Sequence, residues 1–376
     1  MARMFLALKE MRRAKVRFGL LMGAIGLLVF LVLFQQSLQN GLLTSFVGGL
    51  RNQSAPVLVY SVDGRRNLQG GVILPDLEKK VRAVEGVGKI GHLSLSTFTA
   101  TAAGKEVDAA VVGYEDRAVG APGSLTSGRY PTAPNEAIAN ESDAERGFAV
   151  GDVVTLLPGG DRITVVGAAR DVQINVTPTL FTPYAGYEAA VRSRFPNATT
   201  ILPNALAVQP APGTSPATLV ARINAASVEL DALTRADAAD KAPGVANVRQ
   251  SFSVIFLLYG LVVPFVTGLF FLIITFQKSA SLTLLRAIGA SGQTLVRSLL
   301  VQVVIVIAAG LIIGVGLYWP ISQQRLGTIQ LRFETPAVIV WSVLLLVFGL
   351  ASSLFSARRV LAIDPLDATT GAGVGR

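Results

Sequence analysis

The sequence predicts a membrane protein with four transmembrane α-helices, one followed by three, and a large extracytoplasmic α+β domain between the first and the second. Hydrophobic residues make up 51% of the 376 residues, more than soluble proteins of this length usually contain. Four apolar runs are each close to the ~20 residues that cross a bilayer. The segment 39–250 carries 19 basic and 20 acidic residues, a balance suited to a domain in water. The expected spans are Phe18–Phe34, Val254–Phe276, Leu299–Trp319 and Ala337–Leu354.

Basic residues indicate the orientation of these spans. Residues 1–17 contain six lysines and arginines against one acid, the loop after the second span contains three and no acid, and Arg358 and Arg359 follow the fourth span. Because positive charge favours the cytoplasmic side, we expect both termini inside and the domain outside a bacterial cytoplasmic (inner) membrane. Tyr318 and Trp319 are expected as anchors at the membrane surface. No small-residue cleavage site follows the first run, so we expect an uncleaved span.

Seven segments follow from this topology. They are an amphipathic cytoplasmic helix (1–15), the first span with an outward stalk (16–50), the extracytoplasmic domain (51–240), a second stalk with the second span (241–277), a basic cytoplasmic segment (278–298), the third and fourth spans (299–356) and a cytoplasmic tail (357–376). Both stalks are expected to be helical. A rigid helix in each stalk would carry movement between the membrane and the domain.

Short apolar runs separated by turn residues predict the α+β character of the domain. Gly159 and Gly160 are expected to supply the positive φ angles of a hairpin turn at 158–161. The expected strands are Val57–Val62, Ile90–Ala100, Val107–Gly113, Val150–Leu156, Ile163–Gly167 and Ala198–Val208, and the expected helices are Pro75–Val84, Ser142–Gly147 and Ser215–Ala236.

Glycines recur at helical spacing in the first two spans. Gly19, Gly23 and Gly26 share one face of the first span, and Gly260 and Gly268 flank a proline in the second. Small residues let helix backbones approach closely in lipid, so these faces are candidates for helix–helix contact. The glycines and the proline of the second span are also compatible with a kink whose freed backbone groups are satisfied by neighbouring helices.

The sequence lacks the patterns of common catalytic and metal sites. The pairs Gly88-Lys89 and Gly104-Lys105 do not fit a P-loop, so we do not expect this chain to hydrolyse ATP. There is no cysteine, and the single histidine, His92, is expected to be structural, so no metal site is predicted. The sequence contains no Gly-x-Ser-x-Gly nucleophile elbow, so we do not predict a hydrolase. The net charge of +9 arises outside residues 39–250 and indicates membrane topology, with no nucleic-acid partner.

A basic stretch between the second and third spans is the most informative part of the chain. It contains Lys278, Arg286 and Arg297, and Ala280–Ile288 is rich in helix formers, with Gly289 in the position of a helix stop. This predicts a short helix beneath the membrane. The alternative is a connecting loop whose cations reach the membrane surface.

The stretch Leu285-Arg286-Ala287-Ile288-Gly289-Ala290-Ser291, just after a second span, resembles the coupling segment of FtsX/MacB-type ABC transporter permeases. Other stretches resemble the exterior domain and the C-terminal signature of the same family: Gly128–Glu136, Gly151–Val154, Val165–Gly167 and Arg358–Asp367. In layout and length the chain is similar to FtsX-like permeases of the type VII ABC fold, close to the MacB, DevC and LolC/LolE types. MacB carries a fused ATPase domain that is absent here, so the resemblance implies a separate ATPase.

The resemblance implies a permease subunit that is not an enzyme and has no cofactor of its own. Two copies, identical or related, would pair through the first two spans, with contacts at Gly19, Gly23, Gly26, Gly260 and Gly268. Two copies of an ABC ATPase would bind ATP and Mg and would dock on Leu282, Leu285, Arg286, Ala287, Ile288 and Gly289. ATP-driven movements would then pass through the stalks to the exterior domains, a mechanism called mechanotransmission.

The cargo and the final task stay open at this point. The resemblance implies export or extraction of a lipid, lipoprotein, peptide or drug-like cargo, and an FtsX-like signalling subunit that activates a cell-wall hydrolase is the alternative. Import of a small solute such as an amino acid is disfavoured, because the apolar cores of the four spans contain no charged or histidine side chain. A periplasmic adaptor, a lipoprotein or a cell-wall hydrolase are further partners compatible with the family.

Overall fold

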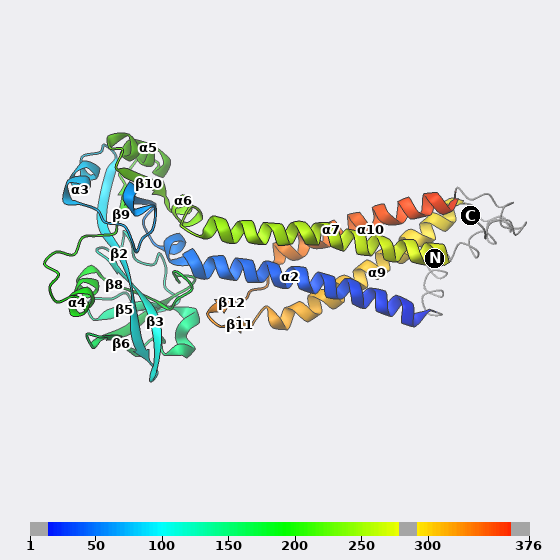
Figure 1. Ribbon diagram of the computed structural model, residues 1–376, viewed down its shortest axis with the longest axis horizontal. Helices are drawn as coiled ribbons and strands as arrows, with labels where there is room; N and C mark the ends of the chain where they lie inside the picture. The colour runs from blue at the N-terminus through cyan, green and yellow to red at the C-terminus, as the bar shows by residue number, and fades with distance from the viewer. Residues whose placement is uncertain (1–13, 278–291, 362–376) are drawn as a thin grey trace, which may run out of the picture. The chain divides into compact units, whose positions relative to one another are not determined.

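The computed structural model describes residues 14–277 and 292–361 (Figure 1). The chain divides into two compact units. The helical bundle comprises the residues up to Gln39, Ser251–Gln324 and the residues from Leu331 onward. The inserted domain comprises Asn40–Gln250 and the short stretch Arg325–Gln330. The sequence prediction of one large domain between the first and second spans is confirmed, with six residues from a later loop added to it.

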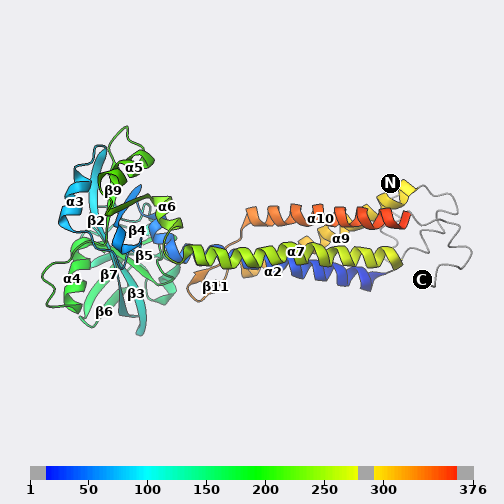
Figure 2. The same cartoon turned by 45° about the horizontal axis from the view of Figure 1, so that its top comes forward.

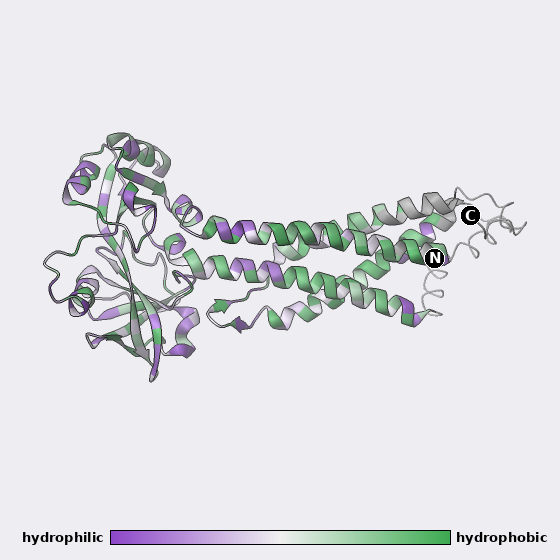
Figure 3. Cartoon of the chain, in the orientation of Figure 1, coloured by the Kyte–Doolittle hydropathy of each residue, from purple (hydrophilic) through white to green (hydrophobic). Residues whose placement is uncertain are grey.

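Within residues 14–277 and 292–361, four long helices build the bundle: α2 (Lys15–Asn52), α7 (Val245–Gln277), α9 (Gly292–Ile321) and α10 (Thr335–Leu361). Three of them are long and apolar enough to cross a membrane, and the apolar part of α10, Thr335–Ala351, is shorter within the described residues. Figure 3 shows that hydrophobic residues dominate these helices, whereas the inserted domain is mixed. The 1 + 3 arrangement predicted from the apolar runs is therefore confirmed.

Within the bundle the four helices run alongside one another (Figures 1 and 2) and share one apolar core. Ile25 and Val29 of α2, Val306 and Ile307 of α9 and Leu345 of α10 are all at most 3% exposed. Because lipid tails are as apolar as these side chains, close packing rather than a hydrophobic gradient must hold such helices together.

Glycines allow α2 and α9 to touch through their backbones. A Cβ atom on Gly26 would lie 2.7 Å from Ile313 Cγ2, and one on Gly314 would lie 2.6 Å from the Gly26 carbonyl oxygen. A Cβ atom on Gly310 would lie 2.6 Å from Ile25 Cγ2. Real Cβ atoms do not approach neighbours this closely, so the contact exists only because these positions lack a side chain.

A polar cluster secures one end of the bundle. The Tyr318 hydroxyl donates a hydrogen bond to the Arg332 carbonyl at 2.7 Å, and the Ser37 hydroxyl donates to the same carbonyl at 2.9 Å. Tyr318 is fully buried, whereas Trp319 is 55% exposed. The Tyr318 hydroxyl thus satisfies a backbone acceptor inside the bundle, and a place for this residue at the membrane surface stays a prediction.

The inserted domain is built on a mixed ten-stranded sheet with the path β10-β1-β9-β2-β3-β8-β5-β7-β4, and β6 pairs with β2 and β7. The pairs β3–β8 and β5–β7 are parallel, and the other pairs are antiparallel. The long strand β2 pairs with three neighbouring strands and extends from one end of the domain to the other (Figure 2). The strands are β1 (Val57–Ser61), β2 (Val87–Ala102), β3 (Lys105–Tyr114), β4 (Ser127–Gly128), β5 (Glu136–Asn140), β6 (Val153–Leu157), β7 (Asp161–Ala169), β8 (Thr179–Pro183), β9 (Ala205–Pro210) and β10 (Leu230–Thr234).

Helices cover the two ends of this sheet. At one end α3 (Pro75–Arg82) and α5 (Pro216–Ala226) pack over β1, β9 and β10, and at the other α4 (Tyr184–Arg194) packs over β2, β3 and β8. Each of these two ends has its own apolar core, and a third apolar core lies between them. This third core contains side chains from the part of α2 that belongs to the inserted domain, together with residues of β1, β2 and β3. The outer part of α2 is thus a structural element of the inserted domain.

The predicted long helix Ser215–Ala236 is wrong in its second half. Helix α5 ends at Ala226, Ser227 is extended, and Leu230–Thr234 form β10, followed by the short helix α6 (Arg235–Asp240). Strand β10 pairs with β1 along its whole length and buries Leu230 and Ala232. Pairing with a distant strand overrides the local helix preference of this stretch.

Two smaller expectations also need correction. The predicted strand Ala198–Val208 begins only at Ala205, because the Asn204 side chain accepts a hydrogen bond from the Leu95 amide at 2.9 Å and ends the preceding loop. The hairpin β6–β7 is confirmed, but of its two glycines only Gly160 has a positive φ angle, 76°. The expected helix at 142–147 is a 3-10 helix, η2 (Glu141–Arg146).

An ion pair closes the turn before β5. The Arg129 guanidinium donates two hydrogen bonds to Glu136, and the amides of Thr132 and Ala133 donate to the same carboxylate at 2.8 and 3.3 Å. The guanidinium and these amides lower the pKa of Glu136 to about 2. The carboxylate side chain is 15% exposed, so the pair is partly protected from water.

We predict that Gly314→Ala destabilises the bundle, whereas Gly316→Ala on the same helix does not. A Cβ atom at 314 collides with the backbone of α2, and a Cβ atom at 316 meets nothing within 4 Å. Overpacking of this kind costs about 1–3 kcal/mol. Thermal unfolding in detergent can be followed by tryptophan fluorescence, since both tryptophans, Trp319 and Trp341, belong to the bundle. Equal unfolding midpoints for the two variants would refute the close contact of α2 with α9.

We predict that Glu136→Gln lowers the stability of the inserted domain at neutral pH and that this difference disappears in acid. The pKa of Glu136 is lowered from an unfolded value of ~4.3, so the stabilisation by its carboxylate is present above that pH and is lost as the pH falls towards about 2. Urea unfolding of the full chain in detergent, followed by circular dichroism at several pH values, measures this. The exposed Glu106→Gln in β3 serves as control, and a pH-independent loss in Glu136→Gln would contradict the prediction.

Candidate functional site

The predicted ATPase-coupling residues lie outside the described part of the chain. These are Leu282, Leu285, Arg286, Ala287, Ile288 and Gly289. The flanking residues are described: α7 ends at Gln277 and α9 begins at Gly292, seven residues before the expected start of the third span. The Arg17 guanidinium of α2 donates a hydrogen bond to the Gln277 side chain. The first span is thus attached to the second immediately before the predicted coupling segment.

The five glycines predicted to contact a second copy have different surroundings in the structure. A Cβ atom on Gly19, Gly23 or Gly260 would meet nothing within 4 Å. Gly26 is buried against α9 of its own chain, so this position is already occupied. Gly268 is half-buried in α7. A contact between copies therefore stays a prediction for Gly19, Gly23, Gly260 and Gly268, whereas Gly26 packs α2 against α9.

The buried polar side chains of the described bundle are all neutral. They are Ser37, Thr267, Gln302 and Ser322. These four groups and the buried Tyr318 hydroxyl can replace little of the water around a charged or strongly polar substrate. Within the described residues, the buried interior of the bundle therefore contains no charged side chain.

At the base of the inserted domain, Asp240 joins the two stalks. Its Oδ1 atom accepts a hydrogen bond from Arg51 of α2 at 2.9 Å and another from Arg249 of α7 at 2.6 Å. All three side chains are about two-fifths exposed, so water screens the pairs and each contributes little to stability. Their value is geometric, because one carboxylate fixes the distance between two helices that continue into the bundle.

Local sequence positions Asp240 for this role. Thr234 caps α6: its hydroxyl oxygen accepts a hydrogen bond from the Asp237 amide at 3.2 Å. Gly244, with a φ angle of +87°, then ends the link between α6 and α7 and lies against the Phe46 ring of α2. The predicted second stalk and span (241–277) is therefore helical from Val245 onward, and a turn separates it from α6.

The outer part of α2 is built into the core of the inserted domain. Leu43, Val47 and Leu50 are at most 9% exposed and belong to its central apolar cluster. A Cβ atom on Gly41 would lie 2.7 Å from the Gln330 carbonyl oxygen, and one on Gly49 would lie 2.5 Å from Ile174 Cγ1. These contacts were not predicted from the sequence, although small residues recur in the first stalk at a spacing similar to that in the span and could have indicated them.

His92, the single histidine, lies among carboxylates on β2. Its Nε2 is 3.0 Å from Glu78 Oε2, its Nδ1 is 3.5 Å from Glu115 Oε2, and its ring lies 5.3 Å from that of Tyr184. These contacts tie α3 and α4 to the long strand. Within the described residues, no group of three or more histidine, aspartate or glutamate side chains is placed to hold a metal ion.

Comparison with known proteins identifies the fold and the class. The family model of the MacB-like periplasmic core domain matches residues 18–226, from the first span through α5. HrtB of Staphylococcus haemolyticus, named as permease of a hemin transport system, is 23% identical over 98% of this chain and 99% of its own length. An ABC transporter permease of Mycobacterium tuberculosis is 22% identical, with the same coverage of both chains.

Solved structures of isolated exterior domains also align with part of the chain. The periplasmic region of MacB from Actinobacillus actinomycetemcomitans is 13% identical, with a TM-score of 0.35, over 50% of this chain and 92% of that one. The extracellular domain of the ABC-type transporter YknZ from Gram-positive bacteria is also 13% identical, with a TM-score of 0.33, over 47% of this chain and 99% of that one. The family model, by contrast, spans more than half of the chain, and the protein belongs to its family as a MacB-like ABC transporter permease of the type VII fold.

Proposed function

We propose that this permease transmits movements driven by a separate ABC ATPase through α2 and α7 to the inserted domain, and so exports or extracts a cargo. The observation that carries the proposal is the double role of α2. The helix is uninterrupted from Lys15 to Asn52, and its two halves belong to two different apolar cores. A helix buried at both ends is a suitable element to carry displacement.

The second stalk supports the same mechanism. Asp240 binds both Arg51 and Arg249, so α2 and α7 are coupled at the base of the inserted domain. At the other end of the bundle, Arg17 of α2 bonds to Gln277 of α7, next to the predicted coupling segment. A push on that segment would act on both helices together. The ATPase would bind ATP and Mg, and this chain would supply the docking residues and the levers.

Two observations bear on the cargo. The relatives named for hemin transport match 98% of it, which makes hemin the first compound to test. The neutral bundle supports a cargo handled outside the helices or at their lipid-facing surface, as lipids, lipoproteins, peptides and drug-like molecules would be.

We predict that Arg286→Glu or Leu285→Asp releases the ATPase. The chain would be co-expressed with candidate ABC ATPases and purified by a tag on this subunit. A reversed charge or a buried carboxylate at a docking helix should reduce the retained ATPase by roughly tenfold or more. The exposed Arg65→Glu in the inserted domain is the control. Undiminished ATPase in both coupling variants would place the docking surface elsewhere, and no ATPase with the well-folded wild type would refute the permease mechanism.

We also predict that hemin stimulates ATP hydrolysis by the complex in lipid nanodiscs, with saturation at increasing hemin. Transport ATPases of this kind are expected to hydrolyse ATP faster when cargo binds, because the cargo favours the state that closes the ATPase. A peptide and a lipoprotein assayed in parallel serve as comparison. Stimulation by one of these alone would assign the cargo to that class. ATP hydrolysis that responds to none of them, together with a cell-wall hydrolase bound to the inserted domain, would favour signalling instead.

A further inference from the structure

The segment between β7 and β8 is attached to the outer part of α2 by its backbone. The amides of Asn175 and Val176 donate hydrogen bonds to the carbonyls of Phe46 and Ser45, both at 2.9 Å, and the Gly49 amide donates to the Gln173 carbonyl at 2.8 Å. A Cβ atom on Gly49 would also lie 2.9 Å from the Val172 carbonyl oxygen. Backbone therefore contacts backbone over most of the segment 171–177, which we call the clamp.

The clamp holds an unusual backbone conformation. Asp171, Asn175 and Val176 have φ angles of 58°, 54° and 60°. Asparagine and aspartate tolerate this left-handed region, but a β-branched valine rarely adopts it. Such a conformation persists only where the surrounding contacts over-determine it. The free energy gained from the contacts of the clamp with α2 and with the rest of the inserted domain must therefore exceed the conformational cost of these φ angles.

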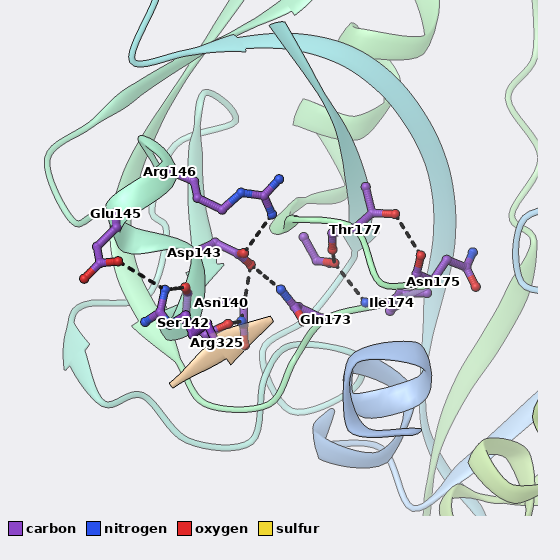
Figure 4. A network of polar contacts seen from close by, with 11 residues as sticks. Asn140, Ser142, Asp143, Glu145, Arg146, Gln173, Ile174, Asn175, Thr177 and Arg325 are labelled. Atoms are coloured by element: carbon purple, nitrogen blue, oxygen red, sulfur yellow. Dashed lines mark hydrogen bonds and ion pairs between the residues drawn. The ribbon is translucent and has the colours of Figure 1, made fainter. Parts of the chain in front are cut away.

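Asp143 of η2 holds the clamp from the other side (Figure 4). Its carboxylate is 1% exposed and accepts hydrogen bonds from Gln173 Nε2 at 2.7 Å and from Asn140 Nδ2 at 3.3 Å, with Arg146 Nη1 at 3.4 Å. Asn140 in turn accepts a hydrogen bond from the Val172 amide at 3.0 Å. Burial raises the pKa of Asp143, and these donors offset only part of that effect. Asp143 thus connects the clamp to the end of β5.

The connection between α9 and α10 reaches the same place. Its residues form the two-stranded hairpin β11 (Arg325–Leu326) and β12 (Ile329–Gln330) within the inserted domain. The Arg325 guanidinium donates a hydrogen bond to the Ser142 carbonyl and lies 3.9 Å from Glu145 (Figure 4). The Ser142 hydroxyl accepts a hydrogen bond from Asn140 Nδ2 at 2.5 Å. Helix η2 therefore contacts both the hairpin and, through Asp143, the clamp.

We propose that Asp143 and the clamp form a joint that makes the outer part of α2 and the α9–α10 hairpin move as one body with β5. The chain of contacts runs from Phe46 through the clamp to Asp143 and η2, and from there to Arg325. Its role in transport rests on the proposed function, whereas the rigidity of the joint is a property of the chain alone. The two claims can be tested separately.

The first experiment measures the joint without nucleotide. In full-length protein in nanodiscs, Gln173→Met keeps the length of the side chain and removes the donor to Asp143. We expect the amides of residues 172–177 to exchange hydrogen about tenfold faster in this variant, since one buried hydrogen bond is lost and the clamp opens locally. Gln209→Met, the same change at an exposed position of β9, should leave the exchange unaltered. Asp143→Asn is a second variant, because its amide cannot accept from all three donors.

The second experiment adds the ATPase partner and compares nucleotide-free and nucleotide-trapped complexes. We expect exchange in β5 and η2 to change with nucleotide in the wild type and in Gln209→Met, and to lose this response in Gln173→Met while ATP hydrolysis continues. Exchange in both Gln173→Met and Asp143→Asn that equals the wild type would overturn the joint. A wild-type complex whose inserted domain never responds to nucleotide would refute the proposed function, and the first experiment would still decide the joint.

Discussion

Helix α2 approaches three other parts of the chain at positions that have no side chain. Gly26 lies against the backbone and side chains of α9, Gly41 against the hairpin that follows α9, and Gly49 against the clamp. In lipid the hydrophobic effect does not drive helices together, so van der Waals contact between closely packed helices must supply the attraction. In the inserted domain the same approach lets α2 exchange hydrogen bonds with a loop, as a strand would. The helix can belong to both units only because small residues recur along its whole length.

The polar groups of the protein are concentrated where helices meet loops. Tyr318 and Ser37 satisfy the Arg332 carbonyl in the bundle, Asp240 joins the two stalks, and Asp143 holds the clamp. In the described bundle, by contrast, the buried polar side chains are few and neutral. Apolar packing therefore dominates the described bundle, whereas hydrogen-bonded side chains connect separate elements within the inserted domain.

The resemblance found in the sequence corresponds to a structural feature in one clear case. The stretch Gly128–Glu136 contains Arg129 and Glu136, whose ion pair and backbone hydrogen bonds close the turn that leads into β5. Gly128 itself has a φ angle of +75° and pairs with Gly167 of β7, where a side chain would collide with backbone. These residues form the edge of the sheet at β4 and the turn into β5. Strand β5 ends at Asn140 and is followed by η2, which is part of the proposed joint.

Local physics by itself determined the membrane class, the order of the spans, and several strands of the inserted domain. Hydropathy, charge and the periodicity of apolar residues depend only on residues that are close in the chain, so these features can be predicted from the sequence. Tertiary structure decided that Leu230–Thr234 are a strand, because their partner β1 lies about 170 residues earlier in the chain. It also decided the burial of Tyr318, the occupation of Gly26 by α9, and the meeting of α2, Asp143 and Arg325. Each of these depends on groups distant in sequence, whose proximity only the folded chain creates.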